Sequence, residues 1–342
     1  MGTDMETIQI ALAFCDPHGT YSRHAAVTMA SIYSNTESKV CIHILHDETL
    51  SDKNRELLTK TAEMYSQEVE FHNLENMLDE DKIDVSKLTL DGAKGTLFRF
   101  MLPELLDVPK VIYMDCDIVV TLDIKEMWDA DMDGCAIAAV PDYWTIEYNK
   151  KGIVPKRLAL AWKSMGISLS EYFNAGVIVM NLDKIRHSYD FLNEIAEFYS
   201  KFKKAITLAD QDCLNYIFAG DCKLIDEKFN KIITYDVDKK QVTGYVWHMA
   251  GGAKPWQGYT RPYIDDLYWY YLKKTPYYTD EAAFIRTILT DVSSSKYMHN
   301  HSSDCVKRIK SQMADNIFRA HIWTIPHILI AFLKQKRLHY KR

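Results

Sequence analysis

The sequence predicts an α/β protein in which a mostly parallel β-sheet is flanked by helices. The first observation is that short apolar, β-branched runs alternate with longer segments whose apolar residues recur at helical spacing. The second is that polar residues directly follow two of these runs, where parallel sheets bind their ligands. With 342 residues, 47% of them hydrophobic, the chain can bury one large core with additions, or form two domains.

The N-terminal third shows the clearest alternation. Ala25, Ala26 and Ala30 give one segment the small surface of a helix packed tightly on a sheet. Ser51 is a typical N-cap for the next helix. We expect strands at residues 8–14, 39–45, 68–72 and 111–114, and helices at 24–33, 51–65 and 96–106.

The remaining elements are less regular. Residues 143–170 lack a clean period, and we expect a loop or a helical insertion there. Residues 245–278 are rich in aromatic side chains and contain three of the seven tryptophans. We expect helices at 123–128, 183–203 and 208–218, and strands at 135–140, 173–182 and 222–225.

Composition restricts the class of protein. The seven cysteines are scattered and form no C-x-x-C pair, which argues against a disulfide framework or a zinc ribbon and favours a reducing cytosol. No basic start precedes an apolar stretch at the N-terminus, so we expect no secretory signal. The formal net charge is −6, but residues 305–342 carry nine Lys or Arg and one Asp, a net of +8, which leaves −14 on the rest.

Asp115 and Asp117 follow the expected strand 111–114 and are separated by Cys116. In an extended chain residues i and i+2 point to the same side, so the two carboxylates can converge while Cys116 faces away. Two carboxylates at the carboxyl end of a buried strand suit a hard divalent cation. The alternative is that these aspartates open a turn or cap a helix.

Other acidic motifs allow different interpretations. Asp115 fits the first aspartate of haloacid-dehalogenase-type phosphatases, with Asp221 and Asp226 as downstream acids. That motif normally follows the first strand of its domain, whereas three strands are expected before Asp115, so a phosphatase is the second hypothesis. Residues 129–134 begin like a calcium loop, but Val140 occupies the twelfth position, where Glu is required, so we expect a solvated turn.

His248 lies 131 residues after Asp117, in a segment that also contains Gly251, Gly252 and Lys254. The ordinary role of such a histidine is a partly buried, hydrogen-bonded imidazole. However, the glycines let backbone approach a ligand, and Lys254 can meet a phosphate as a point charge. With the two aspartates, His248 would form a mixed oxygen and nitrogen set that suits manganese better than magnesium.

Three further segments are weak signals on their own. Residues 210–212, Asp-Gln-Asp, can simply open a helix. Residues 174–176, Asn-Ala-Gly, can be a tight bend, and Arg99 can be a surface residue whose stem lies on the protein.

Taken in order, these segments resemble glycosyltransferase family 8, which includes bacterial lipopolysaccharide galactosyl- and glucosyltransferases and resembles glycogenin. The similarity covers about residues 8–260, and the segment from His248 to Trp256 is its most specific part. The matching residues are Ala13, Cys15 and Asp16; 96–99; 113–117; Pro141 and Asp142; 173–177; 210–212; Phe229 and Asn230; and His248, Gly251, Lys254, Pro255 and Trp256.

The resemblance implies a GT-A fold, which is a Rossmann-like nucleotide-diphospho-sugar transferase. It also implies a UDP-glucose or UDP-galactose donor, Mn²⁺ with Mg²⁺ as the alternative, and retention of the anomeric configuration. By position it makes Asp115, Asp117 and His248 the metal ligands. Cys15 and Pro17 depart from the family pattern beside the expected uridine contacts. The implied donor-binding residues are Ala13, Asp16, Arg99, Asp115, Cys116, Asp117, Asp142, Asn174, Ala175, Gly251 and Lys254.

The family places Asp210 and Gln211 near the anomeric carbon, and we expect them to be catalytic. Retention can proceed by double displacement or by same-face attack within an ion pair. Because an amide is a poor nucleophile, we favour same-face attack. The metal and Lys254 would stabilise the negative charge that grows on the diphosphate. A non-catalytic protein that binds a sugar nucleotide is the third hypothesis.

We expect residues 1–260 to form the GT-A catalytic domain and residues 261–342 an aromatic and helical extension. Residues 316–333 are mostly apolar, with five Lys or Arg after them, and their uninterrupted apolar run is far shorter than the ~20 residues that span a bilayer. This tail suits an anionic membrane surface, or else a contact with the body or with another copy in a homo-oligomer. We therefore expect a cytoplasmic enzyme, peripheral on the inner face of the plasma membrane, with a glycan or glycolipid acceptor and no nucleic-acid partner.

Overall fold

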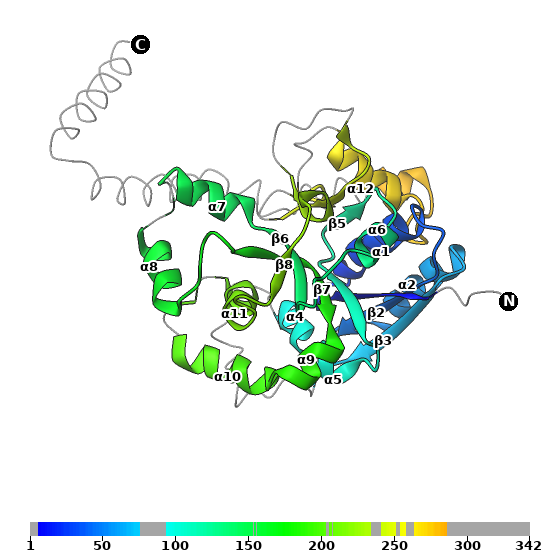
Figure 1. Cartoon of the computed structure of the whole chain (residues 1–342). Helices are drawn as coiled ribbons and strands as arrows, with labels where there is room; N and C mark the ends of the chain where they lie inside the picture. Colours follow the sequence, from blue (N-terminus) through cyan, green and yellow to red (C-terminus); the bar gives the residue numbers. More distant parts are fainter. Residues whose placement is uncertain are drawn as a thin grey trace, which may run out of the picture.

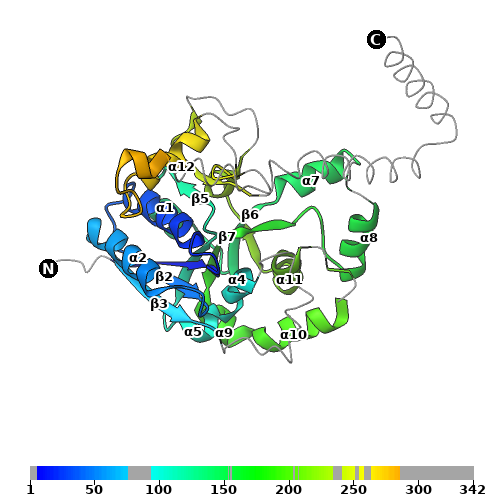
Figure 2. The same ribbon diagram turned by 180° about the vertical axis from the view of Figure 1, so that it is seen from behind.

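The computed structural model describes residues 6–75, 94–152, 154, 156–202, 205–206, 208–233, 241–250, 254–257 and 263–285. A seven-stranded sheet runs through the centre, and helices cover both of its faces (Figure 1, Figure 2). A three-stranded sheet lies beside it. Most of the expected C-terminal extension, including the basic tail, lies outside the described residues.

Four parallel strands form one half of the large sheet, in the order β3-β2-β1-β4. Ser51 caps the second helix as expected, since its hydroxyl accepts a hydrogen bond from the backbone N–H of Asn54. The predicted elements of this half are therefore present, with ends shifted by a few residues. They are β1 (Ile8–Ala13), α1 (Tyr21–Tyr33), β2 (Val40–His46), α2 (Asp52–Met64), β3 (Glu68–Asn73) and β4 (Lys110–Met114).

The segment before β4 is helical, but it is not the single helix that we expected. It consists of α4 (Lys94–Leu97), the 3₁₀ turn η1 (Phe98–Met101) and α5 (Leu102–Leu105). Pro103 explains the interruption, because it has no N–H to donate and its ring would crowd the carbonyl of Arg99 in a continuous α-helix.

The other half of the sheet is mixed. Strand β7 (Phe173–Asn181) runs antiparallel to both β4 and β6 (Ile137–Pro141), and β8 (Cys222–Leu224) pairs in parallel with β6. The mostly parallel sheet flanked by helices is confirmed. The helices that accompany this half are α6 (Lys125–Trp128), α7 (Tyr143–Lys150), α8 (Lys156–Met165), α9 (Leu182–Ser188), α10 (Phe191–Phe202) and α11 (Ala209–Ile217).

Two expectations for this half are refined. The insertion at 143–170 is helical and contains α7 and α8. The helix expected at 183–203 is two helices, α9 and α10, with the break at Tyr189 and Asp190. Asp190 starts the second helix, because its carbonyl accepts the first helical hydrogen bond, from the backbone N–H of Glu194, and its own N–H donates to Glu194 Oε1 at 3.2 Å.

The small sheet was not predicted. Its strands are β5 (Ile118–Val120), β9 (Lys231–Ile232) and β10 (Val246–His248), which are too short to show a sequence period. Strand β10 pairs antiparallel with β5, so that His248 lies opposite Ile118. The pairing thus brings a distant histidine beside the residue that follows Asp117.

Side chains alternate between two apolar clusters along the central strands. Ala11 and Val111 belong to the cluster under α4, α5, α10 and α11, whereas Leu12 and Ile112 belong to the cluster under α1 and α2. Each fully buried aliphatic or aromatic side chain contributes roughly 1.5–3 kcal/mol. A third cluster joins α12 (Ile264–Leu272) to α1, and the predicted domain boundary at residue 260 stays a prediction.

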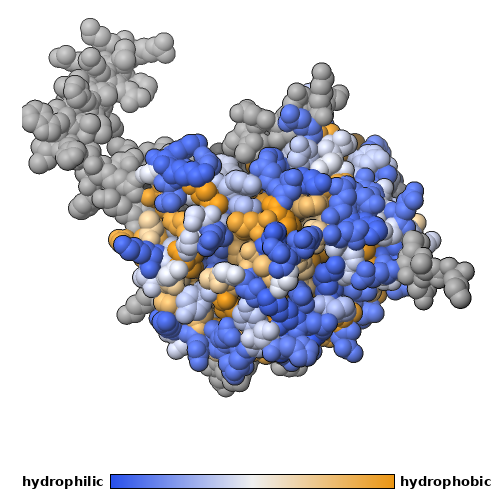
Figure 3. Space-filling view, viewed as in Figure 1, coloured by the Kyte–Doolittle hydropathy of each residue, from blue (hydrophilic) through white to orange (hydrophobic). Residues whose placement is uncertain are grey.

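None of the described helices is both long and apolar enough to cross a bilayer. On the face that Figure 3 presents, hydrophobic side chains reach the surface near the centre and are surrounded by hydrophilic ones.

Candidate functional site

The predicted metal ligands lie together where β4 ends. Asp115 and Asp117 follow β4, and the β5–β10 pairing brings His248 to them. His248 Nε2 is 3.3 Å from Asp117 Oδ1 and 3.7 Å from Asp115 Oδ2. One ligand atom from each of the three side chains lies within 4.8 Å of the others. The structure therefore forms the Asp-Asp-His group that the sequence predicted.

Hydrogen bonds fix the orientation of His248. Its Nδ1–H donates to Asn230 Oδ1 at 2.9 Å, which leaves the Nε2 lone pair facing the two aspartates. Asn230 in turn donates to Asn174 Oδ1 at 2.8 Å. The imidazole thus presents the nitrogen that a cation requires. Asn230 was part of the family pattern, but it was not predicted as a site residue.

Gly176 is the second residue that the sequence reasoning missed. A Cβ at this position would collide with the imidazole of His248 and lie 2.8 Å from Asp115 Oδ2. The carbonyl of Gly176 also accepts a hydrogen bond from the backbone N–H of Asp115 at 2.8 Å. The absence of a side chain therefore lets β7 pass directly behind the ligand group.

The pKa values of the two aspartates are shifted in opposite directions. Burial would raise the pKa of Asp117, but Lys254 and His248 hold it below its usual value. Lys254 Nζ contacts Asp117 Oδ2 directly and donates to the carbonyl of Met249 at 2.6 Å. Burial raises the pKa of Asp115, and Arg99 offsets only part of that effect. Asp117 is therefore the more readily ionised carboxyl of the pair.

Arg99 is buried, not a surface residue. Its Nη2 donates to Asp115 Oδ1 at 2.9 Å, and its Nη1 lies 3.1 Å from Asp210 Oδ2. The guanidinium also lies 4.0 Å above the ring of Tyr113, whose hydroxyl donates to Asp115 Oδ1 at 2.9 Å. Arg99 thus holds a predicted metal ligand and a predicted catalytic residue in fixed positions.

Gln211 is the centre of a buried amide network. Its Nε2 donates to Asp142 Oδ2 at 3.0 Å, and its Oε1 accepts from Asn174 Nδ2 at 3.2 Å and from the backbone N–H of Ala175 at 3.0 Å. Asp142 also caps α7 by accepting from the backbone N–H of Thr145. Four predicted residues, Asp142, Asn174, Ala175 and Gln211, are therefore in contact.

The residues at the end of β1 are placed differently. The carboxylate of Asp16 accepts from the backbone N–H groups of Tyr21 and Ser22, at 2.7 and 3.3 Å, and from Asn54 Nδ2 at 3.0 Å. This carboxylate therefore holds the start of α1, and a contact of Ala13 or Asp16 with uridine stays a prediction. Cys116 is buried, with Sγ 3.7 Å from the carbonyl oxygen of Ala13.

Trp256 anchors the segment that carries Lys254. Its ring stacks on His24 at a centroid distance of 3.7 Å, and His24 Nδ1 lies 2.6 Å from the hydroxyl of Tyr268. The segment is thus held between α1 and α12. Gly251, the other predicted diphosphate contact, lies outside the described residues.

The chain is similar in sequence to known glycosyltransferases. The sequence model described as "Glycosyl transferase family 8" matches residues 13–260. General stress protein A of Bacillus subtilis is 26% identical over 285 residues, which is 76% of this chain and 92% of that protein. The lipopolysaccharide 1,3-galactosyltransferase of Salmonella typhimurium is 24% identical over 246 residues, or 68% of this chain and 69% of that protein. Some relatives are longer, and the matches span 41% and 42% of two Streptococcus pneumoniae glycosyltransferases.

The fold is shared with a solved enzyme. The galactosyltransferase LgtC, crystallised with donor and acceptor sugar analogs, superposes with a TM-score of 0.65 at 22% identity, covering 80% of this chain and 98% of that one. This similarity confirms the predicted GT-A fold. Because the family pattern spans most of the chain and the fold agrees with it, the chain belongs to glycosyltransferase family 8.

Proposed function

We propose that this glycosyltransferase moves a hexose, glucose or galactose, from a UDP-sugar to a glycan or glycolipid acceptor, with Mn²⁺ bound and with retention of the anomeric configuration. The observation that carries the proposal is the group of Asp115, Asp117 and His248 at the ends of the sheet strands, in which Asp117 and His248 are buried and Asp115 is half-buried. Parallel strands gather their ligand-binding residues at this edge.

The residues present fit a divalent cation. Asp117 Oδ1 is buried and accepts no hydrogen bond within the described part of the chain. Two carboxylates and an imidazole make a mixed donor set that suits Mn²⁺ better than Mg²⁺. When bound, the ion would act as a Lewis acid toward the diphosphate leaving group.

Lys254 supplies a second positive charge at the same place. Its ammonium contacts Asp117 and so lies beside the metal ligands. A diphosphate that approaches those ligands meets this ammonium, which would stabilise the negative charge that grows as the sugar–phosphate bond breaks. We assign Lys254 and Gly251 to the diphosphate, and Ala13, Asp16 and Cys116 to the uridine side of the donor site.

The donor sugar is assigned to the region beside Arg99, Asp142, Asn174 and Ala175. Asp210 and Gln211 are proposed as the residues nearest the anomeric carbon. The amide oxygen of Gln211 already accepts two hydrogen bonds, which lowers its availability as a nucleophile. This supports same-face attack, in which the acceptor hydroxyl enters on the side that the diphosphate leaves.

The acceptor is proposed to bind beside α7. Tyr143 and Trp144 directly follow Asp142 and are 42% and 39% exposed, and aromatic faces of this kind suit sugar rings. Relatives named as lipopolysaccharide galactosyl- and glucosyltransferases support a surface glycan or lipopolysaccharide as the product. We propose a cytoplasmic location at the inner face of the plasma membrane, through the basic tail.

The phosphatase hypothesis is not supported. Of its two expected downstream acids, Asp221 precedes β8 at the amino end of that strand, opposite to the edge that carries Asp115, and Asp226 follows β8 and accepts a hydrogen bond from the backbone N–H of Lys228. Asp221 is instead bound by Lys184 and Tyr189. Oδ1 of Asp115 accepts from both Arg99 and Tyr113, which leaves only Oδ2 for a nucleophilic role.

The test is a screen of UDP-sugars with Mn²⁺, in which release of UDP by slow hydrolysis or by transfer is measured. We expect one UDP-hexose to give UDP, and the Asp115→Asn, Asp117→Asn double variant to lose at least about 100-fold of this activity. Asp131→Asn, on an exposed turn, is the matched control and should keep full activity. Binding of UDP-sugar without any release of UDP would instead indicate a non-catalytic protein and overturn the proposal.

The membrane assignment has its own test. Full-length protein should float with vesicles of anionic lipid, and a chain that ends at Asp304 should not. Equal flotation of the two would remove the tail from the proposal.

A further inference from the structure

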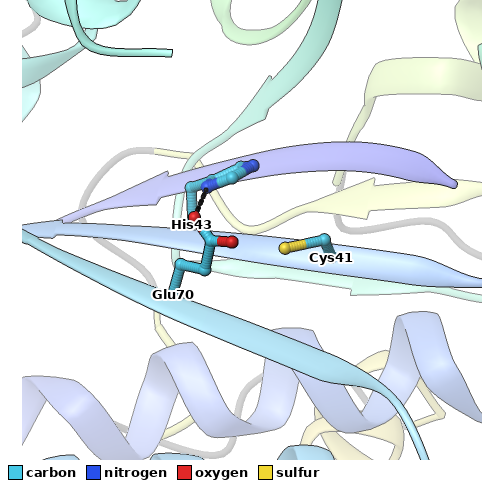
Figure 4. A group of neighbouring side chains, drawn as sticks. All are labelled: Cys41, His43 and Glu70. Carbon is cyan, nitrogen blue, oxygen red and sulfur yellow. Dashed lines mark ion pairs between the residues drawn. The ribbon is translucent and has the colours of Figure 1, made fainter. Parts of the chain in front are cut away.

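A second group of metal-binding side chains lies in the middle of the sheet, away from the strand ends. Cys41 and His43 alternate along β2, and Glu70 and His72 alternate along β3. The register pairs His43 with Glu70, so all four side chains point to the same face. Figure 4 shows Cys41, His43 and Glu70 gathered on this face, and one ligand atom from each lies within 4.8 Å of the others.

The distances between these atoms are those of a coordination shell. His43 Nδ1 lies 3.4 Å from Glu70 Oε2 and 3.1 Å from His72 Nε2, and the last two atoms are 3.7 Å apart. Nitrogen and oxygen ligands that surround a zinc ion tetrahedrally at about 2.0–2.2 Å are roughly 3.3–3.6 Å from one another. The three atoms can therefore bind one ion with only small adjustments.

An outer partner orients the histidine. The Nε2–H of His43 donates to Gln9 Oε1 at 2.8 Å, so the Nδ1 lone pair faces the group. Zinc-binding histidines almost always donate their second ring N–H in this way. Burial lowers the pKa of His43 to about 4, so the ring is neutral and able to bind metal at neutral pH.

Cys41 adds the donor that selects the metal. Its thiol is buried and has no hydrogen-bond partner within the described part of the chain. A hydrogen bond between His43 and His72 would by itself account for their 3.1 Å distance, but it would leave the thiol of Cys41 without a partner. Sulfur, an imidazole nitrogen and a carboxylate oxygen form a set that suits zinc and is unlike the oxygen-rich set of Asp115, Asp117 and His248.

We propose that Cys41, His43 and Glu70 bind a zinc ion that ties the edge strand β3 to β2, with His72 next to His43 and Glu70. Among the described strands, β3 is the last on this side of the sheet and pairs only with β2, so a metal link would hold it in register. The side chain of Glu70 is 59% exposed and offers the ion a route from solvent. Binding would release the thiol proton of Cys41 to solvent as the thiolate forms.

The experiment uses the full chain, stripped of metal and reloaded with Zn²⁺, with the Asp115→Asn, Asp117→Asn double variant as background to remove the other site. Zinc content and affinity are measured by elemental analysis and by competition with a chromogenic chelator. Co²⁺ serves as a spectroscopic substitute, because a bound thiolate gives a charge-transfer band and tetrahedral geometry gives intense d–d bands. We expect one zinc per chain and both cobalt signatures.

The variants test whether the zinc ion is bound by these particular side chains or by any cysteine thiol of the chain. Cys41→Ser should abolish the charge-transfer band, and both Cys41→Ser and Glu70→Gln should weaken zinc binding at least about tenfold. Gln9→Ala, which removes the outer partner, should weaken it by about 10–100-fold. Cys222→Ser, at a partly buried cysteine on β8, is the matched control and should change nothing.

Three outcomes would overturn the proposal: no zinc retained in the double-variant background, unchanged affinity in Cys41→Ser and Glu70→Gln, or a cobalt spectrum without the thiolate band. Circular dichroism on each variant shows that it is folded, and Glu70→Gln, at an exposed side chain, keeps the test valid if Cys41→Ser does not fold. Because none of these readouts uses UDP-sugar turnover, the result is independent of the proposed function.

Discussion

The Asp115–Asp117–His248 site and the β2–β3 cluster of Cys41, His43, Glu70 and His72 differ in how the fold brings their residues together. The first collects ligands from segments far apart in the chain, through the pairing of β5 with β10. The second needs only two neighbouring strands in register. The first is largely buried and supported by several hydrogen-bonded residues, whereas the second has, among the residues that the structure describes, one outer partner, Gln9, and one exposed side chain, Glu70.

This difference shows where each site is vulnerable. The Asp115–Asp117–His248 site depends on residues that never touch a ligand, because its geometry comes from packing and hydrogen bonds around it. The β2–β3 cluster depends mainly on its ligands. Substitutions around the first site should therefore weaken Mn²⁺ binding and leave zinc retention by β2 and β3 unchanged.

The largest effect is expected for Gly176→Ala. The added methyl group would collide with the His248 imidazole and crowd Asp115, so Mn²⁺-dependent binding of UDP should fall at least about 100-fold, and overpacking should cost about 1–3 kcal/mol of the free energy of unfolding. Isothermal titration of UDP with Mn²⁺, and urea unfolding, measure the two effects. Unchanged Mn²⁺-dependent binding would show that the strand can move away from the ligands.

Asn230→Ala should have the next effect. It removes the acceptor that orients the His248 ring and should lower Mn²⁺ affinity by about 10–100-fold, approaching but not reaching the loss in His248→Ala. His248→Ala itself should match the loss of either aspartate. Asn193→Ala, on the exposed side of α10, is the control. If Asn230→Ala bound Mn²⁺ like the control, the hydrogen bond would have no part in metal binding.

Lys254→Met should reduce UDP affinity roughly tenfold, because one charge-assisted contact to the diphosphate is lost. Binding by the unmodified protein should also weaken as salt is raised, and this dependence should be smaller in the variant. Lys273→Met, which removes an exposed ion pair with Glu281, is the matched control. Equal salt dependence in Lys254→Met and the unmodified protein would argue against a diphosphate contact.

The smallest effect concerns pH. Burial, with help from Arg23 and Lys254, holds the pKa of His24 well below its usual 6.5. Below pH 6.5 the unfolded chain therefore binds a proton that the folded protein excludes. As the pH is lowered, the free energy of unfolding should fall by up to about 1.4 kcal/mol for each pH unit. Urea unfolding between neutral and mildly acid pH should show a flatter slope in His24→Gln than in His18→Gln, at an exposed histidine. The same slope in both variants would contradict the prediction.

Much of the fold was accessible from the sequence, because long elements carry a clear period. The parallel strands β1 to β4 and the helices α1 and α2 appeared within a few residues of their expected positions. The Asp115–Asp117 spacing predicted converging carboxylates, which the structure confirms. The small sheet could not be predicted, since strands of two or three residues have no period and their pairing is decided by tertiary packing.

The residues that support the site, Gly176 and Asn230, could not be predicted for a related reason. The role of Gly176 can be predicted only when β7 is known to pass behind His248. The role of Asn230 can be predicted only when β9 is known to pair with β10. The β2–β3 cluster was also missed, although alternation along each strand could have placed its residues on one face. What the sequence lacked was the register between β2 and β3.

The hydrogen bonds from His248 to Asp142 form a continuous chain, and their alignment has a thermodynamic consequence. His248 donates to Asn230, Asn230 to Asn174, Asn174 to Gln211, and Gln211 to the carboxylate of Asp142, so every bond in this chain points in the same direction. Bonds aligned in this way polarise one another. We therefore expect the cation and the sugar to bind with reciprocal coupling, each raising the affinity of the other by the same factor. A double-mutant cycle of Asp142→Asn and Asn230→Ala, with Mn²⁺ affinity in the presence of UDP-sugar as the measured quantity, would test whether the two ends of this hydrogen-bonded chain are coupled. Additive effects would show that they are independent.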